Sequence, residues 1–261
     1  MKSNPFIQSG GGGVRVAVID SGIDLAHPLL RGENLLHDWS FSATHVRQGD
    51  TCGHGTEVAA IIRQFAPRCI LGSFRVLDGN LRTTTEAIAT AARHAMDLGY
   101  HILNLSLADS APGCERIHQE WVSEALARGV HIVASSSNEN VDRAQYPAFL
   151  QGVISVCAQG NASRPEICYR GGAIQFGASG ALAELPDVAK IPPAGVMPIE
   201  PDDMADDTDE IMEAACSSFA VPRVTAALAS ILAATGPLTP PQALDRLRLM
   251  ACSTEPALLI P

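Results

Sequence analysis

The chain has 261 residues, enough for one α/β domain of ordinary size or two small ones, and 46% of them are hydrophobic, which can fill a sizeable core. This composition excludes disorder as the main state. Lys and Arg number 18 against 28 Asp and Glu, so the net charge is −10 and attraction to a phosphate backbone cannot drive binding; we expect no nucleic-acid partner.

The sequence offers little for a membrane, a metal or a disulfide framework. Its longest apolar stretch, 224–234, is interrupted by two hydroxyl residues and is shorter than a bilayer span, and the first residues lack the apolar core of a signal peptide. Seven cysteines form no CxxC pair, and Cys114 and His118, four residues apart, have no second pair of ligands. We therefore expect no membrane partner, no metal, no cofactor, reduced thiols and a cytoplasmic location.

The chain alternates between predicted strands and predicted helices. Residues 1–13, which end in four glycines, are expected to be a flexible arm, and 14–261 a single domain. Runs rich in β-branched residues predict buried strands at 14–20, 69–76, 102–105, 130–133, 153–156 and 173–176, with helical patterns at 55–65, 84–98 and 114–128 between them. This order predicts an α/β fold, doubly wound, with a mostly parallel sheet and helices on both faces.

Two later segments interrupt the alternation. Residues 181 to about 214 contain five prolines and, between Glu200 and Glu213, eight acidic residues with no Lys or Arg, so we expect an acidic loop. It is either a solvated surface insertion or a segment that favours basic peptides or docks a partner protein. Ser217 then opens an alanine-rich helix at 219–234, and a last helix runs from Pro240 to about Met250.

Three chemically suited side chains stand at the ends of predicted elements. Asp20 ends the first strand, His54 lies between two glycines at the start of a helix, and Ser218 opens the alanine-rich helix. Serine is a poor nucleophile until a histidine removes its proton, and a carboxylate must fix the histidine tautomer, so the three can form a triad. Taken singly, each is also typical of a cap or loop residue.

The sequence motifs around these residues resemble those of the subtilisin-like serine proteases, the subtilase family. Residues 18–23 read VIDSGI, 53–59 read GHGTEVA and 218–222 read SFAVP, in the family's order of aspartate, histidine and serine. The resemblance implies a subtilisin-like fold and a serine endopeptidase acting on a peptide or protein substrate. It implies that Ser218 is the nucleophile, His54 the proton shuttle and Asp20 its partner, and that the Asn138 amide and the Ser218 N–H form the oxyanion hole.

The same resemblance suggests where a peptide substrate lies. The segment 102–107, ILNLSL, is similar to the strand that lines the family's specificity pocket, and 133–139, VASSSNE, to the segment that carries the oxyanion asparagine. We expect main-chain pairing by β-addition. The predicted substrate-binding residues are Gly79, Asn80, Leu81, Ser106, Leu107, Ala108, Ser135, Ser136 and Ser137.

Departures from the family pattern keep alternatives open. Ala108, Ser137, Asn140 and Cys216 stand where the family has glycine, so a catalytically inactive pseudoprotease that binds peptides or proteins is one alternative. A macrocyclase that uses the same acyl-enzyme is another, and the expected active form processes a precursor peptide. A nucleotide-binding fold is excluded because the glycines at 10–13 precede the first strand instead of following it.

Two cysteines lie close to the predicted catalytic residues. Cys52 and Cys216 each precede one of them by two positions. They are either small buried hydrophobes or points at which a bulky thiol reagent would block turnover.

Overall fold

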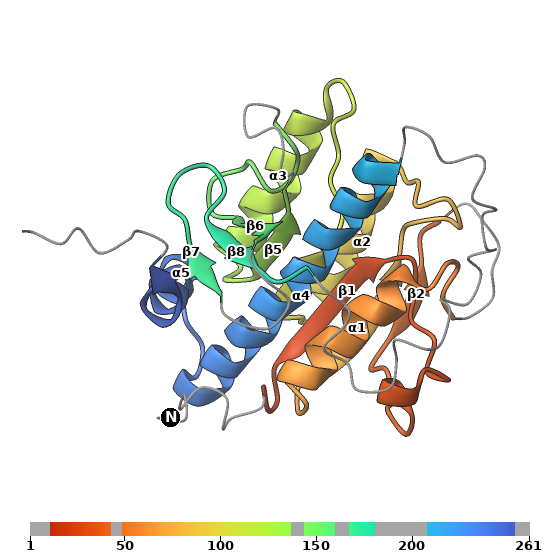
Figure 1. The fold of residues 1–261 in the computed structure, drawn as a ribbon, viewed down its shortest axis with the longest axis horizontal. Helices are drawn as coiled ribbons and strands as arrows, with labels where there is room; N and C mark the ends of the chain where they lie inside the picture. Colours follow the sequence, from red (N-terminus) through yellow and green to blue (C-terminus); the bar gives the residue numbers. More distant parts are fainter. Residues whose placement is uncertain (1–10, 43–48, 137–143, 160–166, 181–207, 254–261) are drawn as a thin grey trace, which may run out of the picture.

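The computed structural model describes residues 11–42, 49–136, 144–159, 167–180 and 208–253, with backbone alone at 208–216 and 252–253. Its sheet has the strand order β2-β3-β1-β4-β5-β6-β8-β7-β9 (Figure 1). The strands are β1 (Arg15–Asp20), β2 (Asp38–Ser40), β3 (Ile70–Arg75), β4 (Ile102–Leu105), β5 (His131–Ser135), β6 (Ile154–Ala158), β7 (Cys168–Tyr169), β8 (Phe176–Ala178) and β9 (Cys252–Ser253). The helices are η2 (Pro28–Leu30), α1 (His54–Phe65), α2 (Thr85–Asp97), α3 (Cys114–Ala127), α4 (Thr208–Thr235) and α5 (Pro240–Met250).

The sheet is parallel except where β7 runs antiparallel to β8. β1 lies between β3 and β4, and side chains alternate across it: Val16 and Val18 belong to one hydrophobic core, Ala17 and Ile19 to the other. A strand covered on both faces is apolar at most positions, which is why the middle of β1, residues 16–19, is a continuous apolar run. The predicted doubly wound, mostly parallel sheet is confirmed.

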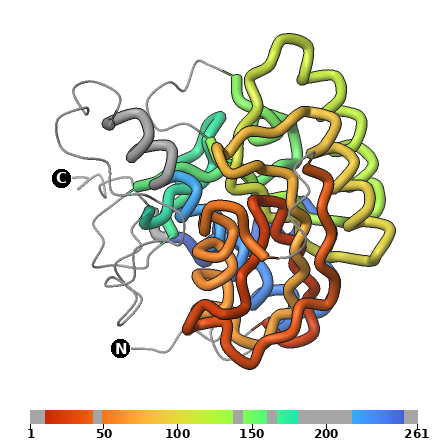
Figure 2. Tube along the Cα trace, turned by 90° about the vertical axis from the view of Figure 1, so that its right-hand side faces the viewer, coloured from red at the N-terminus to blue at the C-terminus, as the bar shows by residue number. Residues whose placement is uncertain are grey.

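The helices form a layer on each side of the sheet. α1 and α4 pack on one face, with α5 beside α4, and α2 and α3 pack together on the other (Figure 1). In the perpendicular view of Figure 2, the gold trace of α2 and the yellow-green trace of α3 lie apart from the orange trace of α1. The carboxyl ends of the parallel strands therefore open at one edge between two helical layers, which is where ligands bind in such sheets.

Some predicted elements differ from the observed ones. The strand predicted at 173–176 lies at Phe176–Ala178, and β2 was not predicted because its three residues are all exposed and give no apolar run. The predicted start of α4 is also wrong: the helix begins at Thr208, so the last seven residues of the predicted acidic loop are helical. This stretch, TDEIMEA, contains no Gly or Pro and has acidic residues in its first turn, which favour a helix N-terminus. The rest of that loop lies outside the described residues.

α4 is the core helix of the domain. The part from Ser217 to Thr235, 19 residues long, contains an 18-residue window with a mean hydropathy of 1.4, which by length and composition alone would suffice to cross a membrane. In the structure 78% of its most apolar window is buried against the sheet and α1. Its apolar character is therefore explained by its place between the sheet, α1 and α5.

Candidate active site

A carboxylate and an imidazole, here called the acid–imidazole pair, meet at the carboxyl edge of the sheet. Asp20 is the last residue of β1 and is fully buried, and His54 is the first residue of α1. The distance from His54 Nδ1 to Asp20 Oδ1 is 2.7 Å. Because an ionised carboxylate only accepts hydrogen bonds, Nδ1 carries the proton, and Nε2 of the neutral ring is left as an acceptor. The pair therefore offers a nitrogen that can take up a proton.

Two influences act on the pKa of His54 in opposite directions. Burial lowers this pKa, whereas the charge of Asp20, the hydrogen bond to it, and the charges of Asp50 and Glu57 raise it. The raising influences prevail, so the pKa lies above its ordinary value. The imidazole is thus a stronger base than that of a free histidine.

The glycines on either side of His54 allow α1 to begin against the end of β1. A Cβ at Gly55 would lie 2.3 Å from the carbonyl oxygen of Gly22 and 3.1 Å from Asp20 Oδ1. Gly53, the N-cap residue, has a φ of 89°, which a side chain would make unfavourable. Close packing beside the carboxylate therefore requires glycine at position 55, and the left-handed backbone conformation favours glycine at position 53.

The start of α1 is capped by residues outside the helix. Because Gly53 has no side chain, the N–H of Gly55 donates instead to Ser21 Oγ at 2.9 Å, and the N–H of Thr56 donates to Asp50 Oδ2 at 2.8 Å. The Ser21 hydroxyl in turn donates to Asp50 Oδ1 at 2.7 Å. These bonds fix α1 to the chain that follows β1.

Asp50 therefore joins both halves of the acid–imidazole pair, a role that the sequence analysis missed. Its carboxylate holds the helix that carries His54 and, through Ser21, the residue next to Asp20. The sequence did contain an indication of this role. A glycine N-cap has no side chain with which to cap its own helix, and an acidic residue stands three positions before it.

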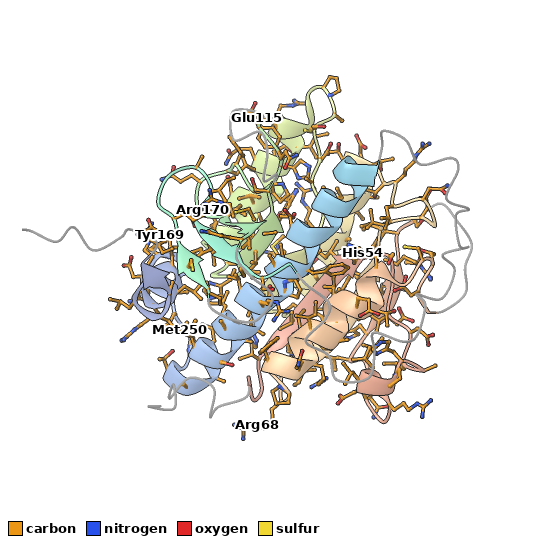
Figure 3. All side chains as sticks on the ribbon, viewed as in Figure 1. His54, Arg68, Glu115, Tyr169, Arg170 and Met250 are labelled. Carbon is orange, nitrogen blue, oxygen red and sulfur yellow. The ribbon has the colours of Figure 1, made fainter. Side chains whose placement is uncertain are left out.

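Ser218 reaches the same region on α4. It is 8% exposed, and its hydroxyl donates to the main-chain oxygen of Ser106 at 3.0 Å. The ring of the next residue, Phe219, has its centroid 5.5 Å from that of the His54 ring. Figure 3 labels His54 at the start of α1. The three predicted catalytic side chains thus come from β1, α1 and α4, with direct contact between the acid and the imidazole.

Ser218 does not open its helix, contrary to the sequence-based expectation. α4 begins at Thr208, ten residues earlier. The first four N–H groups of an α-helix are the ones without a partner inside it, so the N–H of Ser218 falls beyond them. In the part of the chain that the structure describes, Ser218 therefore does not lie at a helix N-terminus. The expected stabilisation of negative charge at Ser218 by such an N-terminus is not found.

The turn after β3 holds three predicted substrate-binding residues, Gly79, Asn80 and Leu81. The Asp78 carboxylate accepts the N–H groups of Asn80 and Arg82, each at 2.9 Å, and these bonds lower the pKa of Asp78. Leu81 is 50% exposed with a φ of 57°, so the turn presents an apolar side chain at its tip.

The other predicted substrate-binding residues follow β4 and β5. Ser106, Leu107, Ser135 and Ser136 are buried at the ends of these strands, and Ala108 is exposed. Ser137 and the predicted oxyanion residue Asn138 lie outside the described residues.

The thiol beside the acid–imidazole pair is not activated. Cys52 is half-buried, and burial, the chief influence, raises its pKa. It therefore stays protonated near neutral pH. The side chain of Cys216 lies outside the described residues.

A cluster of metal-ligand residue types lies on the opposite helical layer. Asp109, Cys114 and His118 have ligand atoms within 4.8 Å of one another. However, Trp121 Nε1–H donates to His118 Nδ1 at 3.1 Å, which places the ring proton on Nε2, and Nε2 donates to Asp109 Oδ2 at 2.9 Å. A metal needs a ring nitrogen with a free lone pair, and both are engaged. The arrangement favours a hydrogen-bonded cluster.

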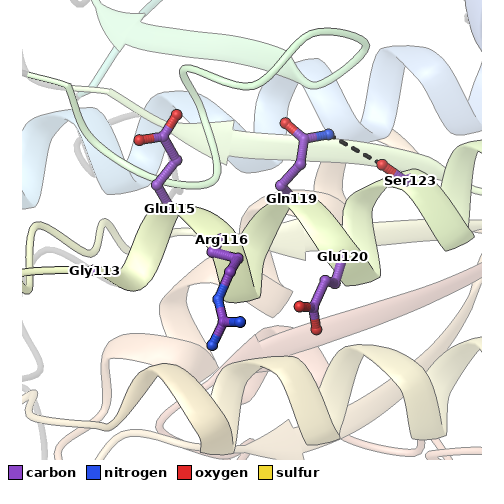
Figure 4. Close-up of a pocket in the computed structure, with 6 residues that line it drawn as sticks. All are labelled: Gly113, Glu115, Arg116, Gln119, Glu120 and Ser123. Atoms are coloured by element: carbon purple, nitrogen blue, oxygen red, sulfur yellow. Dashed lines mark hydrogen bonds between the residues drawn. The ribbon is translucent and has the colours of Figure 1, made fainter.

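A hollow of about 540 Å³ lies along the outer side of α3 (Figure 4). It is lined by Gly113, Glu115, Arg116, Gln119, Glu120 and Ser123. None of these described lining residues belongs to the predicted site, so the hollow is separate from it.

The chain is similar in sequence to several bacterial proteases. It is 34% identical over 157 residues to subtilisin BL of Lederbergia lenta, 28% identical over 158 residues to thermitase of Thermoactinomyces vulgaris, and 32% identical over 180 residues to the thermostable alkaline protease of Halalkalibacterium halodurans. These matches cover 57%, 57% and 65% of this chain, and 56%, 56% and 48% of the relatives. The chain thus aligns with about half of each relative's length.

Solved structures share the fold. A cold-adapted subtilisin-like serine proteinase superposes with a TM-score of 0.68 at 21% identity, covering 92% of this chain and 82% of the other. A lanthipeptide protease superposes with a TM-score of 0.63 at 20% identity, covering 89% and 78%. The sequence profile of the subtilase family matches residues 11–254. The chain therefore belongs to the subtilase family and has its subtilisin-like α/β fold.

Proposed function

We propose that this chain is a serine endopeptidase that cleaves peptide bonds through an acyl-enzyme. The observation that carries the proposal is the 2.7 Å contact between His54 Nδ1 and Asp20 Oδ1, which leaves Nε2 as a proton acceptor. Membership of the subtilase family supports the same chemistry.

In the proposed mechanism the Ser218 hydroxyl turns from the Ser106 carbonyl to Nε2 of His54. Ser218 Oγ attacks the scissile carbonyl while His54 takes its proton, and Asp20 stabilises the imidazolium. Collapse of the tetrahedral intermediate breaks the C–N bond, and His54 returns the proton to the leaving amine. A water molecule, deprotonated in the same way, then releases the acyl group and restores Ser218.

The proposed oxyanion donors are the side chain of Asn138 and the N–H of Ser218. Two such donors act where negative charge develops, and losing one costs about 10²–10³ in kcat. For the N–H of Ser218 to serve, α4 has to begin later in the working enzyme than it does here, because an N–H inside a helix is already engaged.

A fluorophosphonate probe tests the proposal, because it forms a covalent bond only with an activated serine. The wild-type chain should be labelled, Ser218→Ala should not, and Ser217→Ala, the matched control on the neighbouring hydroxyl, should be. Labelling of folded Ser218→Ala, or no labelling of the folded wild-type chain, would contradict the assignment.

A second candidate function is peptide binding without catalysis. It is favoured by the direction of the Ser218 hydroxyl, which donates to Ser106, and by the position of Ser218 beyond the first turn of α4. This candidate predicts peptide affinity with no probe labelling, so the same experiment separates the two.

The proposed substrate is a precursor peptide processed in the cytoplasm. One fold neighbour is described as a lanthipeptide protease, and the five cysteines whose side chains are described are reduced, as expected in a reducing compartment. Hydrolysis and macrocyclisation share the first half-reaction, and mass spectrometry of the product separates them. Hydrolysis adds the mass of water across the two fragments, whereas a cyclic product of transpeptidation does not.

A further inference from the structure

The helix that carries Ser218 has a gap in its own hydrogen bonding at that residue. Residue 222, four positions after Ser218, is a proline inside α4. Proline has no N–H, so the carbonyl of Ser218 lacks its normal partner within the helix. A buried carbonyl without a partner is unfavourable, and a donor from another element is needed.

Ser106 supplies that donor. Its hydroxyl donates to the carbonyl oxygen of Ser218 at 2.8 Å, while the Ser218 hydroxyl donates to the carbonyl oxygen of Ser106 at 3.0 Å. Both residues are buried. The two serines therefore form a reciprocal pair that joins α4 to the end of β4.

Two further residues fix the Ser106 hydroxyl. Asn104 Nδ2 donates to Ser106 Oγ at 3.2 Å, and Thr225 Oγ1 donates to Asn104 Oδ1 at 2.7 Å. Both are fully buried. The directions follow from the chemistry: a carbonyl only accepts, so the Ser106 hydroxyl donates to Ser218 and accepts from the amide NH₂ group, which turns the amide oxygen toward Thr225.

These contacts close a ring between one strand and one helix. Asn104 lies in β4 and Ser106 is the residue just beyond its end, and Ser218 and Thr225 are seven residues apart and share a face of α4. Such a ring fixes the position of the helix along the strand, because a shift of either element would break several buried bonds together.

We propose that Asn104 and Thr225 are positioning residues that hold Ser218 at the carboxyl edge of the sheet through Ser106. The inference rests on the proposed function, since it takes Ser218 as the nucleophile. Removing the Thr225 hydroxyl leaves the Asn104 oxygen without a donor, frees the amide to rotate, and releases the Ser106 hydroxyl from its fixed direction. A small displacement of a nucleophile is enough to slow its reaction.

The test compares three variants of the full chain by peptide kinetics and by the rate of fluorophosphonate labelling. Thr225→Val, which keeps the shape and removes the hydroxyl, should lower kcat and the labelling rate about tenfold with little change in KM. Thr225→Ser, which keeps the hydroxyl, should restore both to within about twofold of wild type. Thr235→Val is the matched control on the same helix, because its hydroxyl donates within its own helix, to the Ile231 carbonyl.

Two results separate a positioning role from a loss of fold. They are the recovery of activity in Thr225→Ser and a lower kcat with little change in KM in Thr225→Val. Urea unfolding at the temperature and pH of the assay shows that each variant is folded there, and the rates are compared under those conditions. Equal rates for folded Thr225→Val and wild type, or equal losses in Thr225→Val and Thr225→Ser, would overturn the inference. If the wild-type chain is not labelled at all, the proposed function has failed instead; Thr225→Val should then still show a perturbed Asn104 side-chain amide resonance by NMR, and an unchanged one would overturn the ring itself.

Discussion

The imidazole of His54 is buried, and yet it binds its proton more tightly than an exposed histidine. Burial lowers the pKa of this ring, but the charge of Asp20 and the hydrogen bond to it, together with the smaller effects of the Asp50 and Glu57 charges, raise it by more. The sign has a consequence for stability as well. Because the pKa is raised on folding, protonation of His54 stabilises the folded chain at pH values below its unfolded pKa, and this contribution is lost as pH rises through the folded pKa.

Asp20→Asn should lower the pKa of His54, because burial then acts without the opposing charge. The acid limb of kcat/KM, which for wild type is expected above the ordinary histidine value of about 6.5, should move to lower pH, and kcat should fall by about 10⁴. An NMR titration of the His54 ring measures the pKa directly even where turnover is too slow.

Glu57→Gln is the matched control for this change. Glu57 acts on the pKa of His54 through its charge alone, and its effect is smaller than that of Asp20. It should shift the titration in the same direction and by less. A titration midpoint that Asp20→Asn leaves in place would contradict the assignment of Asp20 as the dominant partner.

A bulky maleimide attached to Cys52 should block turnover, because the thiol lies two residues before His54 and is only half-buried. Burial raises the pKa of Cys52, so the rate of labelling should increase with pH. Cys52→Ala should stay active and resist the reagent. Full activity after labelling confirmed by mass spectrometry would show that the thiol is remote from the reaction.

At the scale of elements, the start of α1 depends on a residue that is not part of the helix. Asp50→Ala removes the acceptor of four hydrogen bonds, from the Ser21 hydroxyl, the Cys52 N–H, and both the N–H and the hydroxyl of Thr56. The free energy of unfolding should fall by about 2 kcal/mol, and kcat by about tenfold as His54 loses its fixed orientation.

Urea unfolding and peptide kinetics measure the two effects of Asp50→Ala. Asp97→Ala is the matched control, because Asp97 lies on the surface in an exposed ion pair with Arg128 and should leave both quantities unchanged. A loss of stability in Asp50→Ala with unchanged kcat would mean that the cap contributes to the stability of the fold and not to catalysis.

Elements that are buried on both faces could be predicted from the sequence, whereas those defined by their surroundings could not. β1, β3 and β4 are buried at almost every position and mostly apolar, and their predicted bounds agree with the structure to within one residue at each end. β2 is a short exposed edge strand, recognisable only once β3 is in place beside it. α4 begins early because residues 208–214 favour a helix, whereas their acidic composition had suggested a loop.

The same distinction applies to the site. Asp20 and His54 stand in local sequence patterns that also determine their geometry, namely a strand end and a glycine-flanked helix start. Asn104 and Thr225 are 121 residues apart, and their contact follows from the register of α4 against β4, which no local pattern contains. Their role therefore required the structure.

At the scale of the whole molecule, charge is distributed very unevenly along the chain. The stretch from Glu200 to Glu213 holds −8 of the net −10. Changing Asp202, Asp203, Asp206 and Asp207 to Asn keeps the chain length and removes half of that charge.

If this stretch attracts basic substrates, the fourfold Asn variant should lose about tenfold in kcat/KM for a basic peptide and little for a neutral peptide of the same length. The difference should shrink at high salt, because screening removes the same attraction in the wild-type chain. Identical ratios of basic to neutral cleavage in the two chains at low salt would show that the stretch plays no part in selecting substrates.

α4 carries Ser218 and at the same time packs against α1, α5 and the strands β4, β5, β6 and β8. The reacting group is thus mounted on the helix that the hydrophobic interior is assembled around. During heating, such a helix cannot come loose before the interior itself melts. Catalysis and cooperative structure should consequently vanish at the same temperature, with no intermediate stage at which an intact but idle fold persists.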